Sequence, residues 1–220
     1  MRALILGASG GIGAAVAARL RDDGAEVITL SRRADGFDVA RPEQVDKCLG
    51  AVDGPFDMVF VALGILAPAG HAPEKSLSAI NADTMAQVIA VNTIGPALIL
   101  RHAARLLPKD RRAVVAVLSA RVGSIGDNQI GGWYSYRASK AALNQVVHGA
   151  AIELGRSHKN SICVALHPGT VATPFTANYA DRHKTVTADS AATNLLAVIA
   201  GLRRDQTGGF YDYAGQEVIW

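Results

Sequence analysis

Short apolar runs alternate with longer segments of helical periodicity along the whole chain. Uninterrupted apolar runs are typical of strands buried on both faces of a parallel sheet. They predict strands at Ala3–Leu6, Glu26–Leu30, Asp57–Ala62, Val114–Ser119 and Ser161–Leu166, with a last strand near Gly209–Tyr213. Helical patterns fill the gaps at Ile12–Asp22, Pro42–Leu49, Ala82–Leu107, Tyr134–Ser157 and Ala188–Leu202. This alternation predicts a single doubly wound α/β domain over residues 1–220, with helices on both faces of a parallel sheet.

A glycine-rich turn follows the first predicted strand. Gly7, Gly11 and Gly13 stand between that strand and a helix of small residues. Glycines allow a tight turn and a close approach of the backbone to a pyrophosphate, which the N-terminal amides of the helix attract. Three residues follow the first glycine, so the spacing differs from G-x-G-x-x-G. We interpret the turn as a dinucleotide site, with a plain turn as the alternative.

The end of the second predicted strand reads Ser31-Arg32-Arg33. A site for NAD usually has a carboxylate here for the ribose hydroxyl, whereas a site for NADP needs cations for the 2′-phosphate. The first carboxylate is Asp35. The two arginines therefore favour NADP over NAD, and an exposed basic turn is the alternative.

Tyr136 and Lys140 are separated by one helical turn, so their side chains project from the same face of a helix. A nearby ammonium group stabilises a phenolate, so we expect Lys140 to lower the pKa of Tyr136 and make it a proton donor and acceptor. Pro96 lacks the amide hydrogen that would bond the carbonyl of Asn92. We expect that carbonyl to bind a water linked to Lys140, or else a kink that only fits the helix to the sheet.

Composition excludes several classes of function. The chain is 50% hydrophobic and 19% charged, its net charge is only +3, and the basic residues are scattered, which argues against nucleic-acid binding. Cys48 and Cys163 suggest no disulfide framework, and the six histidines lack metal-ligand spacing. The apolar runs are far shorter than the roughly 20 residues of a membrane helix. We therefore expect a cytoplasmic protein without a metal or a membrane partner.

Taken together, these motifs resemble the short-chain dehydrogenase/reductase family over nearly the full chain. Residues 6–13 are similar to the family's cofactor turn, and residues 168–173 are similar to its nicotinamide-side loop. Tyr136 and Lys140 match the family's active-site pair, and Asn92 matches its helix asparagine. Residues 123–137 and 208–220 look closest to the C-factor and sniffer-like carbonyl reductase branch. The resemblance implies a Rossmann-type fold and a small carbonyl or alcohol substrate. The expected cofactor-binding residues are Gly7, Ser9, Gly11, Ile12, Gly13, Ser31, Arg32, Arg33, Asp38, Val39, Ala62, Leu63, Gly64, Asn92, Tyr136, Lys140, Pro168, Gly169, Val171 and Thr173.

The serine that polarises the substrate in this family has no direct equivalent. The family usually has a serine pair at the end of the fifth strand, and here the pair reads Ser119-Ala120. Ser124 has close to the family's usual separation from Tyr136, so we favour it. Ser119 is the alternative, although strand alternation would point it away from a site that residue 120 faces. The turn Val61–Gly64 also lacks a polar residue that the family commonly has.

The predicted function is NADP-dependent interconversion of a carbonyl and an alcohol by hydride transfer. By resemblance, Tyr136 exchanges a proton, Lys140 lowers its pKa and holds the ribose, Asn92 anchors a relay water and Ser124 orients the carbonyl. Residues 174–187 are the predicted substrate lid. A cofactor-binding signalling or regulatory module with little turnover is the alternative, which Ala120 and the C-factor resemblance permit.

We also expect a homodimer or tetramer. The helical segments Ala82–Leu107 and Tyr134–Ser157 carry more apolar and small residues than one sheet-facing stripe requires. The family commonly pairs these helices across a two-fold axis, and coverage within one chain is the alternative.

Overall fold

Six parallel strands form the central sheet of the structure, a computed structural model that describes residues 1–173 and 185–220. They are β1 (Arg2–Leu6), β2 (Glu26–Leu30), β3 (Met58–Val61), β4 (Ala113–Leu118), β5 (Ser161–His167) and β6 (Phe210–Asp212). Their spatial order is β2-β1-β3-β4-β5-β6, and each neighbouring pair is parallel. All six confirm strands that the apolar runs predicted, with ends that differ by a few residues.

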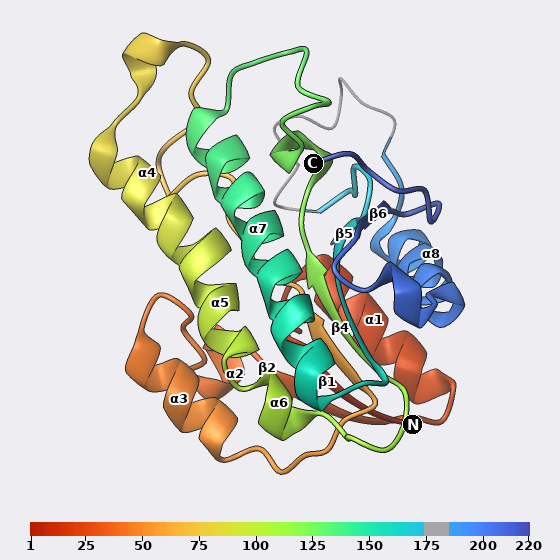
Figure 1. Ribbon diagram of the computed structural model, residues 1–220. Coiled ribbons are helices and arrows are strands. Elements are labelled where there is room, and N and C mark those ends of the chain that lie inside the picture. Colours follow the sequence, from red (N-terminus) through yellow and green to blue (C-terminus); the bar gives the residue numbers. More distant parts are fainter. Residues whose placement is uncertain (174–184) are drawn as a thin grey trace.

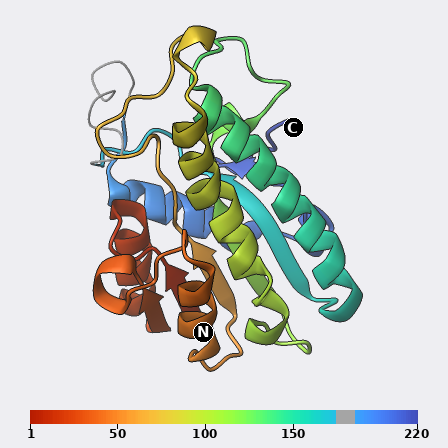
Figure 2. The same cartoon turned by 90° about the vertical axis from the view of Figure 1, so that its left-hand side faces the viewer.

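Helices cover both faces of this sheet, as the alternation predicted (Figure 1; Figure 2). One face carries α3 (Pro42–Gly50), α4 (Ala82–Ile89), α5 (Gly95–Leu100), α6 (Ala103–Leu106) and α7 (Tyr134–Ser157). The other face carries α1 (Gly11–Asp22) and α8 (Ala188–Gly201). The shorter helices are α2 (Arg32–Asp35), η1 (Leu77–Ala79), η3 (Arg121–Gly123) and η5 (Arg204–Gln206). The fold is therefore the predicted doubly wound α/β architecture.

Alternation along β4 and β5 divides the core into two clusters. From Ala113, every second residue of β4 packs toward α7, and the residues between them pack toward α1 and α8. Because side chains alternate along a strand, Ser119 directly after β4 continues on the α7 face. The same alternation, with Cys163 on the α7 side, puts His167 at the end of β5 on that face too. The two strand ends thus present neighbouring polar residues to one side of the sheet.

The segment after β3 departs from the single helix Ala82–Leu107 that the sequence predicted. It consists of α4, the π-helix η2 (Ala90–Ile94), α5 and α6. Pro96 has no amide hydrogen, so an α-helical bond to the carbonyl of Asn92 is impossible, and the wider π-helical turn lies at this point. The interruption therefore follows from a proline that the sequence displays.

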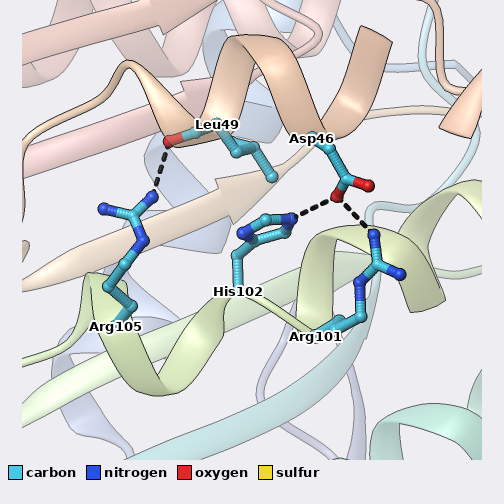
Figure 3. Close-up of polar contacts among 5 residues, drawn as sticks. All are labelled: Asp46, Leu49, Arg101, His102 and Arg105. Atoms are coloured by element: carbon cyan, nitrogen blue, oxygen red, sulfur yellow. Dashed lines mark hydrogen bonds and ion pairs between the residues drawn. The ribbon is translucent and has the colours of Figure 1, made fainter. Parts of the chain in front are cut away.

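Polar contacts join α3 to the chain after α5 (Figure 3). Asp46 of α3 accepts hydrogen bonds from Arg101, and it pairs with His102 Nε2 at 2.8 Å. Arg105 donates to the carbonyl oxygen of Leu49 at 2.6 Å. The last carbonyls of a helix have no intrahelical partner, so this guanidinium acts as a C-terminal cap for α3. Together the contacts fix α3 against α5 and α6.

The helical segment Ala82–Leu100 is the one stretch of the described residues that is long and apolar enough to cross a membrane by length and composition. Core helices of soluble proteins meet the same criterion, and this segment packs against α7. Of the predicted lid, residues 174–184 lie outside the described part of the chain. Thr187 caps α8, because its hydroxyl accepts the amide hydrogen of Ser190 at 3.1 Å.

Candidate active site

The glycine-rich turn after β1 lies at the switch point of the sheet, where β2 pairs on one side of β1 and β3 on the other. Gly7 has φ +92°, and its amide donates to the carbonyl of Leu30 at 2.8 Å. A Cβ on Gly7 or Gly13 would come within 2.4 Å of a main-chain oxygen, and one on Gly11 within 2.7 Å of a Thr173 methyl group. Only glycine fits at positions 7 and 13, where the turn packs closely against neighbouring main chain.

The N-terminus of α1 suits an anionic ligand. Gly10 is the N-cap, so no side chain caps the helix, and the first turn of α1 contains no acidic residue. The first amides of a helix lack intrahelical acceptors and carry the positive end of its dipole. Ser9 and residues 11–13 line a cavity at this point. Phosphate oxygens would supply the missing acceptors, so the residues present fit a dinucleotide cofactor.

The residues after β2 form a compact basic turn. Ser31 caps α2, since its hydroxyl accepts the amide hydrogen of Ala34 at 3.2 Å. The Asp35 carboxylate folds back and accepts the amide hydrogen of Ser31 at 2.8 Å. Arg32 and Arg33 are both exposed. The turn thus presents two guanidinium groups to solvent, and it also brings a carboxylate to the end of β2 that the sequence did not place there.

Asp38 and Val39 were predicted to bind the cofactor, but neither residue lines the main cavity. The Asp38 carboxylate accepts the amide hydrogen of Ala40 at 3.1 Å. Val39 is buried against Gly95, where a Cβ would come within 2.7 Å of the Val39 Cβ. Val39 therefore packs directly on the junction between η2 and α5.

Tyr136 and Lys140 are both buried near the start of α7, and both line the cavity. Lys140 Nζ donates to the carbonyl of Leu118 at 2.9 Å and lies 5.9 Å from the centre of the Tyr136 ring. Burial lowers the pKa of Lys140 to about 7 and raises the pKa of Tyr136 above its ordinary value. The direction for Tyr136 is opposite to the lowering that the sequence predicted, because removal from water disfavours the phenolate.

The Asn92 side chain ties the turn after β3 to α7. Its Oδ1 accepts the amide hydrogen of Ile65 at 2.8 Å, and its Nδ2 donates to Ile65 O at 2.8 Å and to Ser139 Oγ at 3.0 Å. Ser139 in turn donates to the carbonyl of Tyr136 at 2.7 Å. Ala62, Leu63 and Gly64, just before Ile65, line the cavity. Asn92 thus joins the predicted cofactor-side and catalytic segments, although it is not itself part of the cavity wall.

The two candidate serines differ in position. Ser124 is buried outside the cavity wall, and its hydroxyl accepts the amide hydrogen of Asp127 at 3.0 Å. Ser119 lines the cavity, and its hydroxyl donates to Asn144 Oδ1 at 2.6 Å. Alternation was expected to point Ser119 away from the site, but the α7 face to which it points is the face that carries Tyr136 and Lys140. The structure therefore brings Ser119, and not Ser124, beside the predicted catalytic pair.

The loop after β5 closes the cavity near the glycine turn. Pro168, Gly169, Val171 and Thr173 line it together with Thr170. Val171 is buried and forms a parallel bridge with Val186, so this part of the loop is paired. The cavity between these segments has a volume of about 580 Å³. Among residues 1–173 and 185–220, no three His, Cys, Asp or Glu side chains are grouped as a metal site requires.

Three residues that the sequence did not single out shape the substrate side. Glu74 is buried, accepts hydrogen bonds from the amide and hydroxyl of Ser135, and accepts the Trp133 amide hydrogen at its main-chain oxygen (2.6 Å). Trp133 has φ +52°, and its ring meets Tyr136 edge-on with centres 6.2 Å apart. Trp133 and His167 both line the cavity. The contacts of Glu74 join segments far apart in the sequence, so no local motif indicates them.

Comparison with known proteins agrees with the motifs. A family model described as Enoyl-(Acyl carrier protein) reductase matches residues 7–200. The 1-hydroxy-2-glutathionyl-2-methyl-3-butene dehydrogenase of Rhodococcus sp. (strain AD45) is 31% identical over 232 residues, covering 99% of this chain and 98% of that protein. The C-signal of Myxococcus xanthus is 37% identical over 139 residues, covering 62% of this chain and 78% of its own length.

Solved structures share the fold. Carbonyl reductase Sniffer of D. melanogaster has a TM-score of 0.79 at 22% identity, with 100% of this chain and 99% of that chain covered. A short chain dehydrogenase from Burkholderia cenocepacia J2315, in complex with NADP, has a TM-score of 0.77 at 26% identity, with 97% and 96% covered. The similarity extends over almost the entire chain in both cases.

Proposed function

The chain belongs to the short-chain dehydrogenase/reductase family of oxidoreductases, and we propose that it interconverts a carbonyl and an alcohol with NADP as its cofactor. One observation carries the proposal. A single cavity is lined by Tyr136 and Lys140 on one side and by the uncovered glycine turn, residues 9–13, on the other. A ligand bound to the turn would therefore share a cavity with a proton donor. The cofactor supplies the hydride, and the chain binds, orients and exchanges protons.

In this proposal Tyr136 donates its proton to the substrate oxygen in the reducing direction. Its raised pKa keeps the phenol protonated at neutral pH, which is the form that a donor needs. Lys140, with a pKa of about 7, can give or accept a proton near neutral pH. Its ammonium form would also contact the ribose. The Asn92 carbonyl, which Pro96 leaves without an α-helical partner, would anchor the relay water, while its side chain holds Ile65 and Ser139 in place.

Two arginines of this chain and one similar solved structure support NADP over NAD. The exposed Arg32 and Arg33 stand at the end of β2, where cations meet a 2′-phosphate. The Burkholderia cenocepacia relative was solved with NADP. The Asp35 carboxylate argues in the other direction, but it already accepts hydrogen bonds from the amide and hydroxyl of Ser31.

A regulatory module with little turnover is the second candidate. The 37% identity with the C-signal over 139 residues favours it. The buried Tyr136 and Lys140 favour the enzyme, because burying a lysine that has no catalytic use is costly.

We also propose that the protein assembles as a homodimer or tetramer through α4, η2 and α7. Ile94 and Ile152 are 50% and 55% exposed on these elements, which are packed side by side. Light scattering should give at least twice the 22.9 kDa mass of one chain, and Ile152→Glu should reduce it. A monomer at high concentration would contradict the proposal.

The experiment that tests the function is a turnover assay with NADPH and a panel of aldehydes, ketones and quinones. We expect NADPH consumption with at least one carbonyl class and formation of the matching alcohol. Tight NADPH binding without turnover across the panel would favour the regulatory module instead.

A further inference from the structure

One wall of the cavity is formed by the ends of β4 and β5. Ser119, Ala120, Arg121, Val122 and His167 line it, and it lies on the side of the sheet that carries α7. If the proposed function holds, a carbonyl reduced next to Tyr136 needs a second hydrogen-bond donor for the charge that develops on its oxygen. In the family this donor is usually a serine. Here it must come from one of the side chains that line this wall.

The Ser119 hydroxyl and the Arg121 guanidinium already have partners of their own. Ala120 has no hydroxyl, and Ser119 donates its proton to Asn144 Oδ1 at 2.6 Å. Arg121 donates to Asp127 at 2.7 Å and lies 3.8 Å from the Asp212 carboxylate. Ser124 is outside the wall. Among the neutral side chains that line this wall, this leaves the imidazole of His167.

The surroundings of His167 fix which ring nitrogen carries its proton. Nδ1 is buried without a hydrogen-bond partner among the described residues, whereas Nε2 is not in that state. The ring meets Tyr213 edge-on, with centres 6.5 Å apart. A proton on Nδ1 would leave a buried donor unpaired, which costs more than leaving an acceptor unpaired. We therefore assign the proton of the neutral ring to Nε2, and His167 itself lines the cavity.

We propose that His167 is a catalytic residue whose Nε2–H donates a hydrogen bond to the substrate carbonyl oxygen, in place of the hydroxyl that Ala120 lacks. The hydride adds to the carbonyl carbon, Tyr136 gives its proton to the oxygen, and His167 keeps its proton throughout. Burial, together with the charge of Arg121, lowers the pKa of His167 to about 4, against the opposing effect of Asp212. The ring is therefore neutral at physiological pH, and a neutral imidazole can polarise a carbonyl.

The test compares replacements that move the donor. Gln carries its amide nitrogen near the place of Nε2, whereas Asn carries it near the place of Nδ1, and Leu has no donor. We expect His167→Leu and His167→Asn to lower kcat/KM for carbonyl reduction by about 100- to 1,000-fold, the usual effect of losing one oxyanion donor. His167→Gln should recover a substantial part of the loss. The affinity for NADPH, measured by titration, should stay within about threefold of the wild type in all three.

A matched control is His158→Gln, which makes the same change at a buried histidine directly after α7 that does not line the cavity. Melting temperatures of all variants separate misfolding from loss of a donor. Equal activity in His167→Leu and the wild type, or equal loss in the Gln and Asn variants, would overturn the proposal. So would a large loss in Ser119→Ala with none in His167→Leu. A wild type without turnover would instead contradict the proposed function, while the tautomer assignment could still be checked by NMR of the ring nitrogens.

Discussion

On the predicted cofactor side, the cavity is lined by a glycine-rich turn of consecutive residues, whereas on the predicted substrate side it is lined by larger residues from separate segments of the chain. Gly7 and Gly13 of this turn fit only because they lack a Cβ, which would lie 2.4 Å from a main-chain oxygen. Trp133 and His167 lie in separate segments. The main-chain oxygen of Glu74 accepts the Trp133 amide hydrogen, and the Tyr213 ring meets His167 edge-on. A surface built from main chain tolerates no substitution at its glycines, while a surface built from side chains can be changed one residue at a time.

The strongest test of this contrast is Tyr136→Phe. The ring still packs, and only the proton donor is lost, so kcat/KM should fall by about 100- to 10,000-fold while NADPH affinity stays nearly unchanged. Lys140→Ala should impair both quantities, because that side chain serves the cofactor as well as the phenol. Steady-state kinetics and cofactor titration measure them. Retained reduction in Tyr136→Phe would point to a different acid.

Gly13→Ala tests the cofactor side. The added methyl group would lie 2.4 Å from the Gly7 carbonyl oxygen, so the turn must open or the helix must shift. We expect NADPH affinity to fall by at least about tenfold, roughly 1.4 kcal/mol, with a lower melting temperature. Gly149→Ala is the control, because a Cβ there meets nothing within 4 Å in the middle of α7. It should raise stability by up to about 1 kcal/mol. Unchanged affinity in Gly13→Ala would refute the main-chain description.

Arg32→Ala asks whether a side chain matters on the cofactor side at all. The wild type should bind NADPH at least about tenfold more tightly than NADH, and the variant should lose most of that preference. Asp35→Ala is the matched control in the same turn, and it should not favour NADH. Equal affinities for the two cofactors in the wild type would remove the basis for NADP.

The smallest effect is expected from Glu74→Gln, on the substrate side. Burial raises the pKa of Glu74, but hydrogen bonds from Ser135 outweigh burial, so the net pKa is below its ordinary value of 4.5. A lowered carboxyl pKa gives stability that is present above pH 4.5 and lost as the pH falls through the folded-state pKa. At pH 7 the variant should lose about 1 kcal/mol, as for a helix cap, and the difference should shrink in acid.

Denaturant melts at several pH values check this prediction. Glu153→Gln, at an exposed position of α7, is the control and should change little. A difference between Glu74→Gln and the wild type that persists unchanged below pH 4 would show that charge is not the cause.

The sequence predicted the features that depend on local patterns, and it did not predict those that depend on contacts between distant segments. The six strands and α7 were predicted because apolar runs and helical periodicity are local patterns, and the glycine turn because its spacing is local too. An irregularity at Asn92 was predicted from Pro96, but its π-helical form was not, since one proline can kink, end or widen a helix. The predicted orientation of Ser119 was wrong, because strand alternation assigns a residue to one of two sheet faces but does not say which face carries α7. Glu74 and His167 could not be found, because their partners lie about 60 and 45 positions away along the chain.

The π-helix at Ala90–Ile94 limits how the length of this segment can change among related proteins. A π-helical turn holds one more residue than an α-helical turn, so everything after it is rotated relative to what a continuous helix would give. Removing one residue between Ala90 and Ile94 would restore ordinary turns but would turn Asn92 away from Ile65 and Ser139. Length changes in this segment should therefore be rare in relatives that keep the reaction. Where one occurs, we expect the asparagine contact to have been lost with it.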